Sequence, residues 1–336
     1  MSNGTTANDK RVKSAGGAWV GYRADIKVVD CTVRDGGLMN DHAFDDGLVK
    51  AVFDACVAAG VDYVELGYKA SRNVFAPDAF GKWKFCSEDD LRRIVGDNDS
   101  TTKIAVMADA ERTDYHKDIL PCEQSVIDMV RVATYISQIP TAVDMVKDAH
   151  DKGYETTVNL MAISTVQERE LDGALEVLAN TEVAAIYLVD SFGALYSEQV
   201  EYLTRKYLAY AKPAGMEVGI HTHNSQQLAY ANTIHALIMG ANMLDASCAG
   251  MGRGAGNCPL ELLIGFLHNP KFLLRPVLKC IQDYVEPLRE KLQWGYSIPY
   301  MITGHLNQHP RSAMQFNASS DRNNIVAFYD AMIEEE

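Results

Sequence analysis

Short runs of apolar residues recur along the chain, and a segment of helical periodicity separates each run from the next. Several of these runs are continuously apolar, which is typical of strands that are buried on both faces of a parallel sheet. We therefore predict eight strands, at about 26–31, 62–66, 103–108, 128–133, 155–160, 184–189, 217–221 and 242–246.

The segments between these runs have residues suited to starting and ending helices. Gly60 and Gly240 each follow an apolar stripe with a spacing of three to four residues, and glycine readily adopts the left-handed conformation that ends a helix. Asn224 precedes the second stripe and is expected to cap that helix. Helical patterns occupy residues 44–57, 141–152, 168–178, 195–210 and 228–238.

Eight strands that alternate with helices over about 250 residues indicate a (β/α)8 barrel, a TIM barrel. An open doubly wound sheet is the alternative, but no GxGxxG turn follows the first predicted strand. We therefore expect three parts: a polar N-terminal lead-in at 1–18, a TIM-barrel catalytic domain at 19–269 and a C-terminal helical extension at 270–336.

Composition and charge narrow the function classes. The 336 residues are 47% hydrophobic and 23% charged, which is ordinary for a soluble globular enzyme. The formal net charge of −14 argues against a nucleic-acid or anionic-membrane surface, although a local basic pocket can still hold a small anion. No stretch approaches the ~20 apolar residues of a membrane span. The N-terminus lacks a secretion signal and the seven cysteines form no CxxC pair, so we expect a cytoplasmic protein with reduced thiols.

Polar residues stand where several predicted strands end, and the carboxyl ends of the strands carry the active site in barrels of this kind. Arg34 and Asp35 follow the first strand, and His221 and His223 end the seventh. Residues two apart on a strand point to the same face, so both imidazoles can converge with Asp35 on one ion of Mn, Fe, Co, Zn or Mg. Other strands end in Glu65, Arg131, Thr134, Asn159, Asp190 and Ser191.

Each of these motifs also has an ordinary structural interpretation. His-Thr-His can be a surface turn, Asp-Gly-Gly is a common turn sequence, and Arg34 can be a structural salt-bridge partner. The glycine-rich segment 250–257 lacks the residues of a P-loop and can be a flexible crossing, or its Asn257 can supply a neutral oxygen ligand. The occurrence of both motifs at strand ends of one barrel favours the metal site, with Arg34 steadying an enolate oxygen.

Together, these motifs resemble the DRE-TIM metallolyase superfamily of HMG-CoA lyase-like enzymes, and most closely its 4-hydroxy-2-oxovalerate aldolase branch. The resemblance covers about 26–266 and extends more weakly to about 309. The motifs that carry it are DCTVRDGG, VELGYK, VRVAT, LVDSFGA, HTHN and DASCAGMGRGAGNCPLE. Several ordered motifs on successive strands are more specific than any single one.

The resemblance implies that Asp35, His221 and His223 bind a divalent metal, with Asn257 as a further ligand. Manganese is the favoured ion, and magnesium, cobalt and zinc are alternatives. The implied reaction is cleavage of a small 4-hydroxy-2-oxo acid to pyruvate and an aldehyde, in which Arg34 stabilises the pyruvate enolate.

One position departs from the pattern of the aldolases. They carry a general-base histidine three residues after the aspartate, where this chain has Leu38. His42 lies four residues further on; it can swing into the site, but we expect a surface histidine. Tyr296 is the match to a catalytic tyrosine that the C-terminal extension supplies in the aldolases, and His305 and His309 are further candidate proton carriers.

Two other functions fit parts of the sequence. A Claisen condensing enzyme of the isopropylmalate or citramalate synthase type usually has Gly-Glu-Gln after the aspartate, but Gly37 and Leu38 stand at the Glu and Gln positions. HMG-CoA lyase uses a loop cysteine; Cys248 and Cys258 flank the equivalent loop, but neither clearly matches it. A barrel that has lost catalysis and serves as a binding partner is the second alternative, which Leu38 keeps open.

The resemblance also bears on partners. The aldolases commonly work with an aldehyde dehydrogenase that accepts their product, and dimerisation through C-terminal helices is expected by the same resemblance. Apolar stripes in the extension are equally explained by packing within one chain, so the sequence alone decides neither question.

Overall fold

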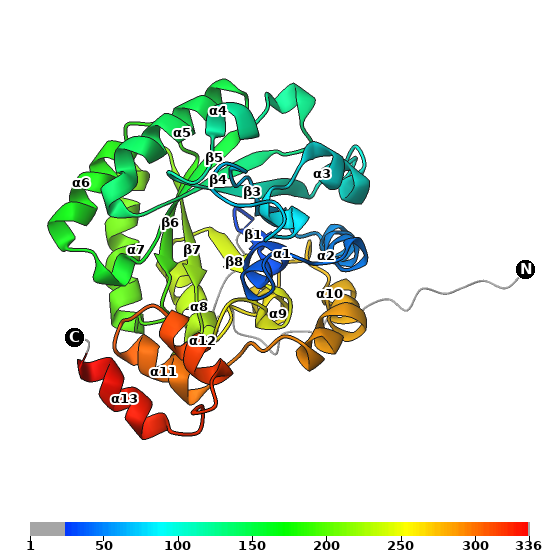
Figure 1. Ribbon diagram of the computed structural model, residues 1–336. Helices are drawn as coiled ribbons and strands as arrows, with labels where there is room; N and C mark the ends of the chain where they lie inside the picture. The colour runs from blue at the N-terminus through cyan, green and yellow to red at the C-terminus, as the bar shows by residue number, and fades with distance from the viewer. Residues whose placement is uncertain (1–23, 335–336) are drawn as a thin grey trace, which may run out of the picture.

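The computed structural model describes residues 24–334, and within this range eight parallel strands close into a barrel in chain order, with β8 paired to β1 (Figure 1). The strands are β1 (Lys27–Asp30), β2 (Tyr63–Tyr68), β3 (Lys103–Asp109), β4 (Met129–Thr134), β5 (Glu155–Leu160), β6 (Ala185–Asp190), β7 (Glu217–Thr222) and β8 (Met243–Ala246). The predicted TIM barrel is confirmed, and each predicted strand overlaps an observed one. The predicted lead-in at 1–18 lies outside the described residues.

Helices surround the strands (Figure 1). They are α1 (Thr32–Gly36), α2 (Asp46–Ala59), α3 (Glu88–Val95), α4 (Tyr115–Asp118), α5 (Ile139–Asp151), α6 (Glu168–Leu178), α7 (Ser197–Ala211), α8 (Ala229–Met239), α9 (Leu260–Leu267), α10 (Leu274–Cys280), α11 (Ile298–His305), α12 (Arg311–Ala318) and α13 (Ile325–Glu334). None of the helices between residues 24 and 334 combines the length and apolarity needed to cross a membrane.

Local capping explains where α2 begins and ends, whereas the start of α8 differs from the prediction. Helix α2 starts at the carboxylate of Asp45, which accepts the amide of Leu48, and ends at Gly60 with a left-handed φ of 74°. The prediction that Asn224 directly caps the helix after β7 was wrong, because Leu228 occupies the cap position of α8. The side chain of Asn224 still accepts the amide of Ala229, and so it bridges the loop to the start of the helix.

The two-residue repeat of the strands separates two layers of the core. In β1, Val28 faces the helices and belongs to the large outer core, whereas Val29 belongs to a smaller cluster inside the barrel. In β4, Met129 also points inward, so the alternation turns Arg131 into the barrel as well. The alternation of side chains along β4 therefore places the charged side chain of Arg131 in the barrel interior.

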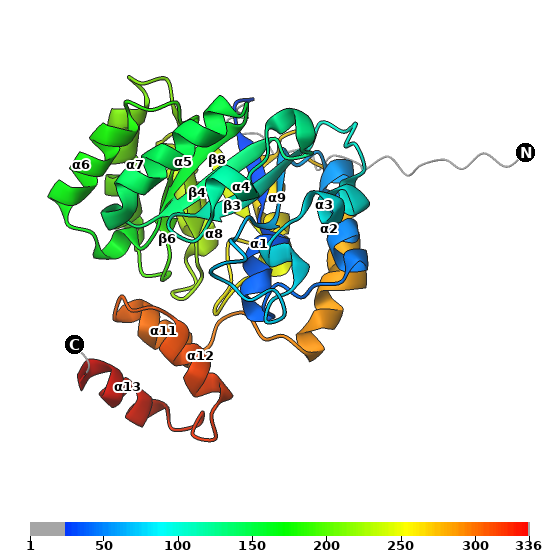
Figure 2. The ribbon, with the colours of Figure 1, turned by 45° about the horizontal axis from the view of Figure 1, so that its top comes forward.

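The C-terminal region contains two differently packed parts. Helix α10 packs on α2, against the barrel. Helices α11, α12 and α13 lie together as a separate group beside it (Figure 2), around a cluster that includes Tyr300, Phe328 and Met332. Ala255 of the glycine-rich loop joins this cluster, so the helices are anchored next to the predicted site. The domain boundary at residue 270 stays a prediction.

Candidate metal centre and active-site cavity

The first strand delivers Arg34 and Asp35 through a short helical turn, α1, that a hydrogen-bond chain holds in place. Thr32 donates its hydroxyl to Asp30 at 2.6 Å and accepts the amide of Cys248, which follows the neighbouring strand β8, at 2.8 Å. Arg34 and Asp35 follow within one turn and are both buried. The link to Cys248 ties this turn to the loop after β8, which carries another candidate ligand.

The glycine pair after Asp35 is needed for space. Gly36 and Gly37 both have ordinary helical φ angles of −59°, so the turn interpretation of Asp-Gly-Gly is wrong here. A Cβ atom on Gly36 would lie 2.8 Å from the side chain of Met251, and one on Gly37 would lie 2.3 Å from the ring of His42. Larger residues would therefore displace Met251 or the ring of His42, which pack against this turn.

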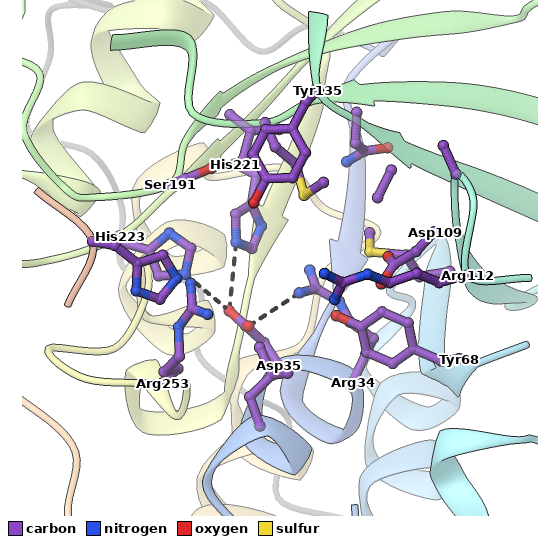
Figure 3. A pocket seen from close by; sticks show the side chains of 18 of the residues that line it. Arg34, Asp35, Tyr68, Asp109, Arg112, Tyr135, Ser191, His221, His223 and Arg253 are labelled. Carbon is purple, nitrogen blue, oxygen red and sulfur yellow. Dashed lines mark hydrogen bonds and ion pairs between the residues drawn. The ribbon is translucent and has the colours of Figure 1, made fainter. Parts of the chain in front are cut away.

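The structure brings the four predicted metal ligands together, and Figure 3 shows three of them, Asp35, His221 and His223. The Nε2 atoms of His221 and His223 lie 3.4 Å and 3.5 Å from Oδ2 of Asp35. Asn257 donates its side-chain amide to the same carboxylate. The ligand atoms of Asp35 and the two histidines all lie within 4.8 Å of one another, which is close enough to share one ion.

The unused hydrogen-bonding atoms at this point fit a cation. Nε2 of His221, Nε2 of His223 and Oδ1 of Asn257 are all buried and have no hydrogen-bond partner in the described residues. Buried polar atoms in folded proteins nearly always have partners, so three orphaned atoms around one carboxylate need an explanation. Imidazole nitrogen, carboxylate and amide oxygen are ordinary ligands of divalent metals, and the residues present therefore fit such an ion.

Both histidines are held in the tautomer that binds metal through Nε2. Nδ1 of His221 lies 2.9 Å from a carboxylate oxygen of Asp245, and Nδ1 of His223 lies 3.0 Å from the backbone carbonyl of Asp190. Because both partners accept, Nδ1 carries the hydrogen in the neutral form of each ring, and Nε2 then presents a lone pair. This carboxylate or carbonyl support is typical of histidine ligands of metals.

Below the candidate ligands, Arg34 takes part in a buried ion-pair network. Its guanidinium lies 3.0 Å from Oδ1 of Asp35 and 2.7 Å from Oε2 of Glu65. Glu65 in turn lies 3.0 Å from Arg131. The carboxylates of Asp35 and Glu65 therefore fix the orientation of the Arg34 side chain.

The network closes on the opposite side of the barrel. Arg131 is fully buried, stacks over the ring of Tyr187 at 4.5 Å and contacts Asp245 at 2.7 Å. The same oxygen of Asp245 supports His221, which contacts Asp35. A continuous ring of charged and polar side chains thus links Arg34 to Asp35 and His221, two of the candidate metal ligands.

These contacts set the protonation states. Burial alone would raise the pKa of Asp35, but Arg34 and the two histidines hold that pKa well below its usual range. Burial lowers the pKa of His223, with partial opposition from Asp35. Burial works in the same direction on His221, yet the carboxylates of Asp245 and Asp35 outweigh it and raise the pKa of His221. An ionised carboxylate and neutral His223 are ready to bind a cation.

A cavity of about 250 Å³ opens above these residues. Arg34, Asp35, His221 and His223 line one part of it, and the predicted strand-end residues Asn159 and Ser191 line it as well. Leu38 also lines the cavity, so an apolar side chain faces the space in place of the family's histidine. Of the other strand-end residues predicted, Glu65 and Arg131 lie in the network below the cavity.

Two predicted catalytic residues are not brought to this cavity. His42 is buried, not on the surface as expected, because its amide bonds to Gly37 and its ring packs edge-on against Tyr68 at 5.2 Å. It does not line the cavity, and burial lowers its pKa to about 3. Tyr296 is half-exposed and lines a separate hollow beside Trp294, because the C-terminal chain enters the cavity only after α11.

His309 is the C-terminal histidine that reaches the cavity. Its ring packs edge-on against Phe192 at 5.8 Å, and burial together with the cations of Arg253 and Arg311 lowers its pKa to about 4. It is therefore neutral at neutral pH, and its Nδ1 accepts the backbone amide of Arg311 at 3.1 Å, which places the ring hydrogen on Nε2. His305, the other histidine considered, is exposed and does not line the cavity.

The glycine-rich loop is folded, not a flexible crossing. Asn257 donates its backbone amide to Gly250, and Asn224 donates to Gly256. Cys258 in this loop is fully buried, and burial raises its pKa to about 12, so it stays a thiol. Cys248 is also buried and does not line the cavity. The loop thus contributes Asn257 and Arg253 to the site, but no reactive thiolate.

Three functional side chains were missed in the sequence. Asp245 follows Met243 on β8 with the spacing of an inward-facing strand residue, so its alternation was a usable signal. Lys84 and Arg112 line the cavity from the loops after β2 and β3. Loop positions have no periodicity from which their direction can be predicted.

Comparison with known proteins agrees with this geometry. The family model described as HMGL-like matches residues 25–282. The 4-hydroxy-2-oxovalerate aldolase 3 of Rhodococcus opacus (strain B4) is 27% identical over 319 residues, which cover 88% of this chain and 89% of that protein. The oxaloacetate decarboxylase of Mycobacterium tuberculosis is 30% identical over 246 residues, which cover 72% of this chain and 69% of that protein.

A solved structure gives the same picture at the level of the fold. The crystallised N-terminal domain of a protein from Bacteroides vulgatus superimposes with a TM-score of 0.77 and 29% sequence identity, covering 90% of this chain and 100% of that domain. Because the family match spans most of the chain and includes every candidate metal ligand, this protein belongs to the HMGL-like family.

Proposed function

We propose that this protein is a divalent-metal-dependent aldolase, a carbon–carbon lyase that cleaves a 4-hydroxy-2-oxo acid to pyruvate and an aldehyde. The observation that carries the proposal is the group of orphaned ligand atoms around Asp35, which lies beside the fixed guanidinium of Arg34 at one cavity. The aldolase name of the Rhodococcus relative, which aligns along most of the chain, supports the same reaction.

Asp35, His221, His223 and Asn257 would hold the ion, and we propose manganese, because two imidazoles with oxygen ligands suit it. When bound, the ion supplies Lewis-acid polarisation of the 2-oxo group of the substrate. Arg34 donates from the cavity wall to the oxygen on which negative charge develops. Asp35 and Glu65 hold its guanidinium in place beforehand, so little reorganisation is needed during the reaction.

Cleavage also requires a proton acceptor for the 4-hydroxyl group. As that proton leaves, the bond between carbons 3 and 4 breaks, the aldehyde departs, and the electron pair moves into the pyruvate enolate, which is then protonated at carbon 3. We assign the acceptor to His309, since it lines the cavity and its depressed pKa keeps it neutral near pH 7. Its Nδ1 accepts the backbone amide of Arg311, so the proton is taken up there when that hydrogen bond opens. Asp109 also lines the cavity, but it faces the cations of Lys84 and Arg112.

One observation favours a second reaction. Leu38 faces the cavity where the aldolases have their base, and decarboxylation of a 2-oxo dicarboxylic acid gives the same enolate without deprotonating a hydroxyl group. The Mycobacterium tuberculosis relative is named as an oxaloacetate decarboxylase. Release of carbon dioxide from oxaloacetate by the manganese-loaded protein, without cleavage of any 4-hydroxy-2-oxo acid, would favour this alternative.

The direct test of the proposed function is exchange of the pyruvate methyl protons for deuterium in heavy water, followed by NMR. We expect exchange with manganese-loaded protein, no exchange with metal-free protein, and loss of exchange in Asp35→Asn. The matched control is Asp54→Asn, which alters an exposed carboxylate of α2. Absence of exchange in the manganese-loaded wild type would contradict enolate chemistry on pyruvate. The homodimer, the dehydrogenase partner and the cytoplasmic location stay predictions.

A further inference from the structure

The cavity is basic although the protein is acidic. The chain has 45 acidic and 31 basic residues, but more cationic than anionic side chains line the cavity. The cations are Arg34, Lys84, Arg112, Arg253 and Arg311, and the carboxylates are Asp35 and Asp109. Arg34 is paired to Asp35 and Glu65. Among residues 24–334, no carboxylate forms an ion pair with any of the other four cations, so the surplus charge is available to a ligand.

Lys84 is the most unusual of these cations. Its side chain is only 6% exposed, and its ammonium lies 4.4 Å from the ring centre of Tyr68 and 4.2 Å from that of Phe75. Phe80 contributes a third ring at 5.8 Å. Aromatic faces offset part of the cost of burying a charge, but they do not replace a carboxylate or water. A buried ammonium that faces a cavity without an ion-pair partner points to an anionic ligand.

A second buried lysine in the same region shows what ordinary pairing looks like here. Lys69 is 3% exposed and lies 3.2 Å from the carboxylate of Glu88, outside the cavity. Lys84 therefore differs from Lys69 in two respects: it faces the cavity, and it lacks a carboxylate in contact. A purely structural lysine would gain stability from a partner of the kind that Lys69 has.

Arg112 extends the cationic surface around Lys84. It lines the cavity from the loop after β3. Burial lowers the pKa of Lys84, and the charge of Arg112 acts in the same direction. Asp109 acts in the opposite sense on Lys84, but it is not within ion-pair distance of either cation. Two cations and one buried carboxylate leave a net positive charge in this part of the cavity.

This part of the cavity lies away from the candidate metal ligands. In Figure 3, Tyr68, Asp109 and Arg112 lie on one side of Asp35, and His223 lies on the other. Tyr68 and Leu38 belong to one apolar cluster, which also contains the rings that hold Lys84. A substrate bound by its 2-oxo acid end at the metal ligands would extend its other half toward this surface.

We propose that Lys84, assisted by Arg112, binds an anionic group on the half of the substrate that leaves as the aldehyde. The substrate is then a 4-hydroxy-2-oxo acid with a second acidic group, either a carboxylate or a phosphate, and the released aldehyde is itself an anion. This inference rests on the proposed function for the orientation of the substrate, and Lys84 is its specificity-determining residue.

The test compares three 2-oxo acids that differ only at the far end and cannot undergo retro-aldol cleavage. 2-Oxohexanoate ends in a methyl group, 2-oxoadipate in a carboxylate, and 2-oxo-5-phosphonopentanoate in a phosphonate. Their dissociation constants are measured by calorimetry with the manganese-loaded wild type. We expect at least one of the two dianionic acids to bind about tenfold to 100-fold more tightly than 2-oxohexanoate, and the better one identifies the chemistry of the group.

Variants locate the source of this preference. Lys84→Met keeps an apolar stem of similar size among the rings and should remove most of the preference. Arg112→Gln changes an exposed side chain and should reduce the preference, and it carries the test if the methionine variant does not fold. Lys82→Met is the matched control, because Lys82 belongs to the same short helix (Lys82–Lys84) but pairs with Asp46 outside the cavity.

The outcomes separate the two proposals. Equal affinity for all three acids in the wild type, or a preference unchanged in both Lys84→Met and Arg112→Gln, would overturn the anion site even if pyruvate exchange occurs. A preference that depends on Lys84, found together with absence of exchange, would support the anion site and contradict the aldolase reaction.

Discussion

The two ends of the cavity differ in how they neutralise charge. At the end formed by β1, β7 and β8, Arg34, Asp35 and His221 belong to a closed ring of contacts, and Nε2 of His221 faces the cavity there without a hydrogen-bond partner in the described residues. At the end formed by the loops after β2 and β3, Lys84 and Arg112 face the cavity and form no ion pair with any residue between 24 and 334. Buried charges are normally paired, so the second end is the exception.

The difference indicates different tasks. A ring of paired charges fixes side chains before any ligand arrives, which suits catalysis that depends on oriented donors and metal ligands. An unpaired cation costs folding stability and is retained where a ligand supplies the missing charge. The paired end is therefore the proposed chemical end, and the unpaired end is the proposed recognition end.

The largest expected effect comes from breaking the paired end. Asp245→Asn leaves Arg131 without one of its two carboxylates and weakens the support of His221. We expect the free energy of unfolding to fall by about 3–5 kcal/mol and manganese affinity to fall by about 10–100-fold. Urea unfolding and calorimetry measure these changes.

The control for this change is Asp54→Asn, which removes an exposed partner of Lys50 on α2 and should alter the unfolding free energy by less than about 0.5 kcal/mol. If Asp245→Asn were as mild as this surface change, the ring of charges would not hold the site together.

The next largest effect concerns the proposed proton acceptor, His309. His309→Asn should lower kcat for cleavage of a 4-hydroxy-2-oxo acid by about 100-fold, because proton transfer from the hydroxyl group is lost. Steady-state kinetics with pyruvate detection measures the change, and His116→Asn on the surface is the control. A kcat within twofold of the wild type would exclude His309 from this role.

A smaller effect, of opposite sign, is expected at Asp30 beneath the paired end. Burial raises its pKa from 3.8 to about 7, so the folded state disfavours the ionised carboxylate. Its contribution to stability is complete below pH 3.8 and is lost as the pH rises through 7. Asp30→Asn should therefore be more stable than the wild type by on the order of 2 kcal/mol at pH 8.

The gain from Asp30→Asn should shrink as the pH falls from 8 to 5 and vanish below pH 3.8, where the wild-type carboxyl group is protonated in both the folded and the unfolded state. Thermal unfolding at pH 5 and pH 8 makes this comparison. A stability difference that does not change between the two values would show that Asp30 is ionised in the folded protein.

The smallest predicted effect comes from replacing Lys84 at the unpaired end of the cavity and comparing it with the paired lysine Lys69. Lys84→Met, without ligand, should raise the unfolding free energy by about 1 kcal/mol, because an unpaired buried charge is replaced by an apolar side chain. Lys69→Met should lower it, since the carboxylate of Glu88 loses its cation. Thermal unfolding of both variants decides the point, and destabilisation of equal size would mean that both lysines are structural.

The barrel and the metal-facing residues could be predicted from local patterns. Continuous apolar runs identified the strands, and the two-residue spacing of His221 and His223 placed both rings on one side. The position of Tyr296 could not be predicted, because it depends on the path of the chain between α10 and α11. The burial of His42 depends on a tertiary contact with Tyr68 that no spacing reveals. Lys84 was missed because its direction is set by three aromatic rings, one at the end of β2 and two in the loop that follows it.

The most direct measurement of the central claim is anomalous diffraction from crystals soaked in manganese. We predict one strong peak within bonding distance of Oδ2 of Asp35 and of Nε2 of both His221 and His223. Cys31, His221 and Asp245 form a second group with atoms close enough to hold an ion, on the Nδ1 side of the same ring. A peak at that second group, or no peak near Asp35, would contradict the proposed metal centre and the chemistry built on it.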